Sequence, residues 1–136
     1  MGDVDRVAKP AKLRLVIGEN NADLAMTLRL LLDAEPDIQC VATAASSAGV
    51  LRTLEAHAPT GFVLDLSLDD GSSLPLIATL RARSPHAVIV VHTGYKSEEL
   101  DDRCLRSGAD AVVLKTGDID ALTVALRQAA SLHANG

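Results

Sequence analysis

The chain has 136 residues and a mass of 14.2 kDa, the size of one ordinary domain. Hydrophobic residues make up 48% and charged residues 23%, which excludes a disordered or fibrous chain. The only aromatic residues are Phe62 and Tyr95, so the core must be aliphatic and a base-stacking surface is disfavoured. The net charge of −5 argues against electrostatic binding to nucleic acid or to an anionic membrane, and we expect neither partner.

Two further features bear on compartment and domain boundaries. Cys40 and Cys104 are far apart in the sequence and suit buried thiols in a reducing compartment better than a disulfide framework. No apolar run approaches the roughly 18 residues of a membrane span, and the N-terminus lacks a signal peptide's apolar stretch. We therefore expect a soluble cytoplasmic protein with a flexible tail at 1–12, one domain at 13–132 and a C-terminal tail at 133–136.

Short apolar runs alternate with helical patterns along the chain. The expected strands, in chain order, are Leu13–Ile17, Ile38–Thr43, Phe62–Asp65, Ala87–His92 and Ala111–Leu114. The last three are nearly continuous in aliphatic residues, as strands buried on both faces are. This alternation predicts an α/β domain with a single doubly wound, five-stranded parallel sheet and right-handed crossovers.

The segment after each strand has apolar residues at helical spacing. In chain order these stripes are Leu24, Leu28, Leu31 and Leu32; Val50, Leu51 and Leu54; Leu74, Ile77 and Leu80; Leu100, Cys104 and Leu105; and Ile119, Leu122 and Leu126. Ser46 or Ser47 is a candidate N-cap of the second helix, and Pro75 suits the first turn of the third. Gly108 is expected to end the fourth helix.

Polar residues lie at the carboxyl ends of four expected strands, where open α/β sheets bind ligands. Glu19 and Asn20 follow the first strand, Asp65 ends the third, Thr93 follows the fourth and Lys115 follows the fifth. Each has an ordinary structural explanation when taken alone, such as a cap for Asp65 or a solvated charge for Lys115. Because all of them converge on one edge of the sheet, we interpret them as a functional site.

Three motifs resemble the receiver domains of two-component response regulators. They are Phe62-Val-Leu-Asp65-Leu-Ser-Leu, Val90-Val-His-Thr93-Gly and Ser107-Gly-Ala-Asp-Ala-Val-Val-Leu-Lys115. The intervals between Glu19, Asp65, Thr93 and Lys115 are also similar to that family's. The resemblance covers about 13–131 and implies the flavodoxin-like (βα)5 receiver fold. It is nearest to receivers that precede a LuxR-type DNA-binding domain, although we identify no such output domain in the sequence.

The resemblance implies a role for individual residues. Asp65 would be the phosphoacceptor that attacks a phosphohistidine on a sensor histidine kinase or histidine phosphotransfer protein. Thr93 and Lys115 would bind the phosphoryl group, and Ser67 and Tyr95 would tune its lifetime. The chain would therefore be a signalling domain and not an enzyme, with at most phosphorylation and autodephosphorylation at Asp65. Its output would be a downstream protein target or a missing output domain.

The same resemblance implies a magnesium site with one departure from the family pattern. Mg²⁺ would be bound by Glu19, Asn20, Asp65 and the backbone carbonyl of Ser67. Most members have two acids after the first strand, and Asn20 stands where the direct acidic ligand is usual. An amide oxygen can bind the ion but brings no charge. We therefore expect weaker magnesium affinity and slower or absent phosphorylation.

Three other positions bear on the output. Val112 occupies the switch position, where the family usually has an aromatic ring, and valine has no ring to rotate. Asp69 replaces a proline that is common after the phosphoacceptor, and we expect it to loosen that loop or add repulsion. A homodimer is possible through the fourth helix, fifth strand and fifth helix, a surface on which we expect Arg127.

Two alternatives remain open from the residues alone. Asn20 and Val112 favour a pseudo-receiver, a protein-interaction module that works without phosphate and binds little Mg²⁺. A small phosphatase with Asp65 as nucleophile is less favoured, because related dehalogenase-like enzymes need a second Asp where Ser67 stands.

Overall fold

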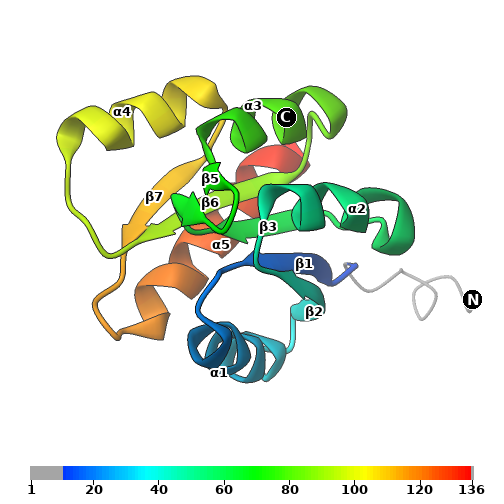
Figure 1. The fold of residues 1–136 in the computed structure, drawn as a ribbon. Coiled ribbons are helices and arrows are strands. Elements are labelled where there is room, and N and C mark those ends of the chain that lie inside the picture. Colours follow the sequence, from blue (N-terminus) through cyan, green and yellow to red (C-terminus); the bar gives the residue numbers. More distant parts are fainter. Residues whose placement is uncertain (1–10, 136) are drawn as a thin grey trace, which may run out of the picture.

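The computed structural model describes residues 11–135, which form a parallel sheet with helices on both faces (Figure 1). The sheet has five strands in the order β2-β1-β3-β6-β7, and all neighbours are parallel. The strands are β1 (Leu13–Gly18), β2 (Ile38–Ala44), β3 (Gly61–Leu64), β6 (Val88–Thr93) and β7 (Ala111–Leu114). The doubly wound α/β fold predicted from the sequence is confirmed. The strand order reverses between β1 and β3, which places the ligand-binding crevice beside these two strands.

Five helices cover the sheet in two layers (Figure 1). They are α1 (Ala22–Asp33), α2 (Ser47–His57), α3 (Leu74–Arg83), α4 (Glu98–Ser107) and α5 (Ile119–Asn135). Residues of α1 and α5 pack with Leu15, Ile17 and Val63 on one face. Residues of α2, α3 and α4 pack with Val16 and Phe62 on the other. Alternate residues of the strands thus enter opposite cores, which is why the central strands are apolar throughout.

The core is aliphatic, as the composition predicted. Phe62 is fully buried, whereas Tyr95 is 67% exposed on the surface. Cys40 and Cys104 are both buried and free, so the prediction of two unpaired thiols is confirmed. Within residues 11–135, no helix combines the length and the apolar character that crossing a membrane would require.

Helix boundaries follow the expected capping residues. The hydroxyl of Ser46 accepts a hydrogen bond from the backbone N–H of Gly49 at 3.0 Å and begins α2. Gly108 ends α4 with a φ of 121°, and its N–H bonds to the carbonyl of Leu105. Asn21 and Ser97 cap α1 and α4 in the same way, although the sequence did not single them out as caps.

The loop after Asp65 differs from the expectation. It contains a two-stranded antiparallel hairpin, formed by β4 (Ser67–Leu68) and β5 (Gly71–Ser72). Leu68 is buried in the core, and the N–H of Asp69 donates to the carbonyl of Ala45 at 3.0 Å. The loop that contains Asp69 therefore has regular secondary structure.

The ends of the domain also differ from the expected boundaries. Helix α5 continues to Asn135, past the boundary expected at 132. The imidazole Nε2 of His133 lies 2.9 Å from Oδ1 of Asp110, which joins the last turn of α5 to the loop before β7. At the other end, Ala11 and Lys12 have no regular secondary structure, and 1–10 of the expected tail lie outside the described residues.

Candidate functional site

The predicted site residues meet at the carboxyl edge of the sheet. Backbone hydrogen bonds continue the parallel ladder just beyond the strands. The N–H of Glu19 donates to Ala44, that of Asp65 to Gly18 at 2.8 Å, and that of Lys115 to Thr93 at 2.6 Å. These bonds hold the first residue after each strand at a common level, so that side chains distant in the sequence lie together.

Lys115 joins the two acidic side chains of the site. Its ammonium Nζ lies 2.7 Å from Oε1 of Glu19 and 2.9 Å from Oδ2 of Asp65. The side chain of Glu19 is only 3% exposed and that of Asp65 16%, so both carboxylates need a cationic partner. One ammonium between two carboxylates leaves the site with a net formal charge of −1.

Burial by itself would lower the pKa of Lys115. The hydrogen bonds to Glu19 and Asp65, together with the negative charge of both carboxylates, outweigh burial and raise this pKa above its usual value. Lys115 is therefore firmly protonated at neutral pH. It serves as a fixed positive charge beside Asp65 and not as a proton donor.

The oxygens near Asp65 are hard donors of the kind that Mg²⁺ takes. The N–H of Ser67 donates to Oδ1 of Asp65 at 3.3 Å, so the Ser67 peptide lies directly beside this carboxylate. Asn20 is exposed and lines a surface hollow together with Glu19. Among the described side chains, no group of three or more His, Cys, Asp or Glu residues could hold a metal ion. An ion here would therefore need amide or backbone oxygens as well as carboxylates.

Thr93 lies at the same edge, and its hydroxyl bonds to the backbone of Tyr95. It is buried, and its hydroxyl accepts from the N–H of Tyr95 at 3.1 Å and contacts the Tyr95 carbonyl at 3.4 Å. Within residues 11–134 the structure shows no hydrogen bond from this hydroxyl to Asp65 or Lys115. In this state the hydroxyl therefore stabilises the turn between β6 and α4.

Val112 lies inside β7, opposite Val91 of β6, and packs against the core beneath α3 and α4. Its short branched side chain has no freedom to rotate into and out of this core.

Two further buried residues, Ser73 and His92, lie beside the site, and no sequence motif marks either as part of it. Ser73 is fully buried, and its hydroxyl donates to the backbone carbonyl of Asp65 at 2.7 Å. His92 is buried on the α1 and α5 side of β6, and its Nδ1 has no hydrogen-bond partner among the described residues. Burial, and then the charge of Lys115, lower the pKa of His92 to about 4, although Asp65 acts in the opposite direction. His92 packs at the end of β6 and is neutral at pH 7.

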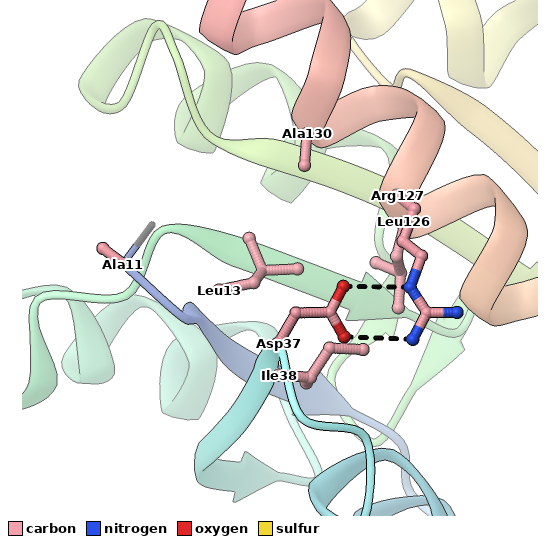
Figure 2. A pocket seen from close by; sticks show the side chains of 7 residues that line it. All are labelled: Ala11, Leu13, Asp37, Ile38, Leu126, Arg127 and Ala130. Carbon is pink, nitrogen blue, oxygen red and sulfur yellow. Dashed lines mark hydrogen bonds and ion pairs between the residues drawn. The ribbon is translucent and has the colours of Figure 1, made fainter. Parts of the chain in front are cut away.

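A second hollow, of about 210 Å³, lies at the opposite end of the sheet (Figure 2). There the guanidinium of Arg127 forms two hydrogen bonds with Asp37, at 2.9 and 3.0 Å, and a third with Glu35. The expectation that Arg127 belongs to the dimer surface was wrong, because its side chain turns to the loop between α1 and β2 and not toward α4. This hollow is separate from the Asp65 site.

Comparison with known proteins decides the family. Residues 15–127 match the model of the response regulator receiver domain. The chain belongs to this family. Receiver domains are the signalling domains of two-component systems, and this chain has the fold of their CheY-like members.

Individual relatives agree with this assignment. The oxygen regulatory protein NreC of Staphylococcus haemolyticus is 31% identical over 117 residues, which cover 85% of this chain and 54% of that protein. NreC of Staphylococcus aureus is 29% identical over the same length, again 85% of this chain and 54% of that protein. The chain thus spans about half the length of the curated relatives it matches.

Solved structures show the same fold at lower sequence identity. A CheY-like receiver domain from Methanospirillum hungatei superposes with a TM-score of 0.82 at 20% identity, covering 92% of this chain and 98% of that one. The receiver domain of the response regulator NarL from Mycobacterium tuberculosis superposes with a TM-score of 0.81 at 20% identity, covering 90% of this chain and 98% of that one.

Proposed function

We propose that this receiver accepts a phosphoryl group on Asp65 from a phosphohistidine of a sensor histidine kinase or histidine phosphotransfer protein. Transfer would require Mg²⁺ and would change the interactions of the domain with its downstream target. The observation that carries the proposal is the contact of 2.9 Å between Lys115 and Asp65 at the edge where the strand order reverses. A carboxylate with a fixed cation beside it suits the role of phosphoacceptor.

The chemistry is a displacement at phosphorus. A lone pair of the Asp65 carboxylate forms the new O–P bond while the N–P bond breaks, and its electrons remain on the imidazole nitrogen of the donor. Lys115 holds the carboxylate in place before transfer and neutralises the phosphoryl oxygens afterwards. Thr93 exchanges its bonds with Tyr95 for a bond to the phosphoryl group, and the turn between β6 and α4 rearranges as a result.

Glu19, Asn20, Asp65 and the carbonyl of Ser67 would hold the metal. When bound, Mg²⁺ neutralises charge on the transferring phosphoryl group. The Glu19 carboxylate already accepts from Lys115 and, at 3.0 Å, from the N–H of Asn21. Because Asn20 adds no charge, affinity should be lower than in a site with a third carboxylate.

The test is phosphorylation by acetyl phosphate at millimolar Mg²⁺, followed by intact-mass measurement. We expect one added phosphate on the wild type and none on Asp65→Asn. Asn20→Asp restores a carboxylate and should increase the Mg²⁺ affinity by about tenfold, measured by isothermal titration. An unmodified wild type would reject the proposal.

A second candidate is supported by the double ion pair of Lys115, which already satisfies Glu19 and Asp65 without a metal. In that case the domain is a phosphorylation-independent interaction module. Asp65→Asn would then leave the partner complex unchanged, whereas the first proposal expects that variant to lose phosphate-dependent signalling.

The relatives suggest where the signal goes. One matched structure is a DNA-binding response regulator of the LuxR family from Staphylococcus aureus, with a TM-score of 0.79 at 19% identity. We propose that the downstream target is an output domain of this kind or a separate protein. Leu105 of α4, Leu114 of β7 and Val124 of α5 are exposed apolar residues, which supports a homodimer through these three elements. Sedimentation velocity before and after phosphorylation tests the dimer.

A further inference from the structure

The hairpin that follows Asp65 is joined to a distant helix. Asp69 and Asp70 form its turn, between β4 and β5. The Asp70 carboxylate receives two backbone N–H groups of α2: Oδ1 accepts from Ser47 at 2.7 Å, and Oδ2 accepts from Ala48 at 3.1 Å. These two hydrogen bonds lower the pKa of Asp70, so it is ionised at neutral pH.

Asp70 supplies what the first turn of α2 lacks. The four N–H groups at the start of a helix have no partner within it. Ser46 accepts two of them in α2, through its hydroxyl from Gly49 and through its carbonyl from Val50. Helix α2 has no acidic residue in its own first turn. The hairpin therefore supplies the acceptors for the other two N–H groups. It also supplies the negative charge that stabilises the N-terminal end of α2.

The other end of the hairpin contacts the phosphoacceptor. The N–H of Ser67, in β4, donates to Oδ1 of Asp65. Just after β5, Ser73 donates its hydroxyl to the carbonyl of Asp65 and its N–H to the carbonyl of Leu66 at 2.9 Å. The hairpin thus lies between Asp65 at its base and α2 at its turn.

We propose that Asp70 is a positioning residue that holds the Ser67 peptide at Asp65 by joining the hairpin turn to α2. Strands of two residues are too short to be stable by themselves. Ser67 and Ser73 hold the base of the hairpin, but without the Asp70 bonds its turn would be held by the burial of Leu68 and by the hydrogen bond from the Asp69 N–H to the carbonyl of Ala45. The Ser67 carbonyl would then have to be ordered when a metal binds, which weakens binding.

This inference rests on the proposed function, because it concerns the same metal site. The first test compares Asp70→Asn with Asp69→Asn by titration with Mg²⁺ alone, followed through the NMR shift of the Ser67 amide. Both variants remove one negative charge at neighbouring positions, but the structure shows no hydrogen bond to the Asp69 carboxylate within residues 11–134. We expect Asp70→Asn to weaken Mg²⁺ binding about fivefold more than Asp69→Asn does.

The second test separates positioning from helix capping. Asp70→Ala and Ser46→Ala each remove a cap of α2, but only the first acts on the hairpin. We expect Ser46→Ala to lower thermal stability with unchanged Mg²⁺ affinity and unchanged hydrogen exchange at Ser67. Asp70→Ala should weaken Mg²⁺ binding and speed that exchange. Equal Mg²⁺ affinity in both members of either pair would overturn the inference.

The outcomes also distinguish this inference from the proposed function. A wild type that takes up phosphate, with Asp70 variants that match their controls, refutes the positioning role alone. A wild type that neither binds Mg²⁺ nor takes up phosphate refutes the proposed function. In that case, hydrogen exchange of the metal-free protein still tests whether Asp70 positions the Ser67 peptide. Unchanged exchange at Ser67 in both Asp70→Asn and Asp70→Ala excludes this positioning role.

Discussion

Lowering the pH should destabilise this domain through one buried imidazole. His92 is 8% exposed and lies near Lys115, and both burial and that positive charge oppose its protonation in the folded state. The unfolded chain protonates His92 near pH 6.5, whereas the folded chain does so at about 4. The pKa of His92 is lower in the folded chain than in the unfolded chain. His92 therefore does not reduce the free energy of unfolding above pH 6.5, and this free energy falls as the pH is lowered toward 4.

The size of the effect follows from the two pKa values. The pKa of His92 is 6.5 in the unfolded chain and about 4 in the folded chain. By linkage, this difference lowers the free energy of unfolding, relative to pH 7, by about 2 kcal/mol at pH 5 and about 3 kcal/mol at pH 4.

The assay is urea unfolding by circular dichroism, since the chain has no tryptophan. Wild type is compared with His92→Leu, which has similar volume and no proton to bind. The other histidines, His57, His86 and His133, are present in both proteins and cancel in the difference. The wild type should lose about 2 kcal/mol more than the variant between pH 7 and 5. Parallel stability curves for the two proteins, or a His92 NMR titration with a midpoint near 6.5, would show that His92 does not cause the loss of stability.

Two further substitutions test packing and charge at pH 7 by the same unfolding measurement. Lys115→Met leaves the buried Glu19 carboxylate without its cation and should cost about 2 kcal/mol, less than in a fully enclosed pair because Lys115 is 22% exposed. Addition of Glu19→Gln should recover part of this loss, and no recovery would contradict the pairing. Gly108→Ala puts a Cβ 2.8 Å from Cβ of Arg81 at a φ of 121°, and should cost about 3 kcal/mol. Gly71→Ala is the control with a similar φ in open space and should cost about 1 kcal/mol.

Much of the site could be predicted because parallel strands share one carboxyl edge. Where apolar runs form neighbouring parallel strands, the residues that follow them lie near one another. Glu19, Asp65 and Lys115 are joined by hydrogen bonds at that edge. Thr93 lies at the same edge, but its hydroxyl bonds to Tyr95 instead, a local turn that strand periodicity does not report.

The remaining features depend on contacts between segments that no local pattern connects. The Asp70 carboxylate caps a helix that begins 23 residues earlier, and Arg127 bonds to Asp37 across 90 residues. A charged residue on a helix looks the same in sequence whether it is solvated or paired. Its partner is known only once the packing angle of the helix places an acid within hydrogen-bond distance.

The alternation of strands and helices, the aliphatic core and the edge at which the polar residues gather could all be predicted from the residues, because periodicity and strand direction are local properties. The pairing of the charged residues at that edge depends on tertiary contacts. These contacts place Lys115 between two carboxylates, keep His92 neutral behind it, and join the loop after Asp65 to α2 through Asp70. These outcomes depend on burial and on distances between remote segments, which are set only when the helices pack on the sheet.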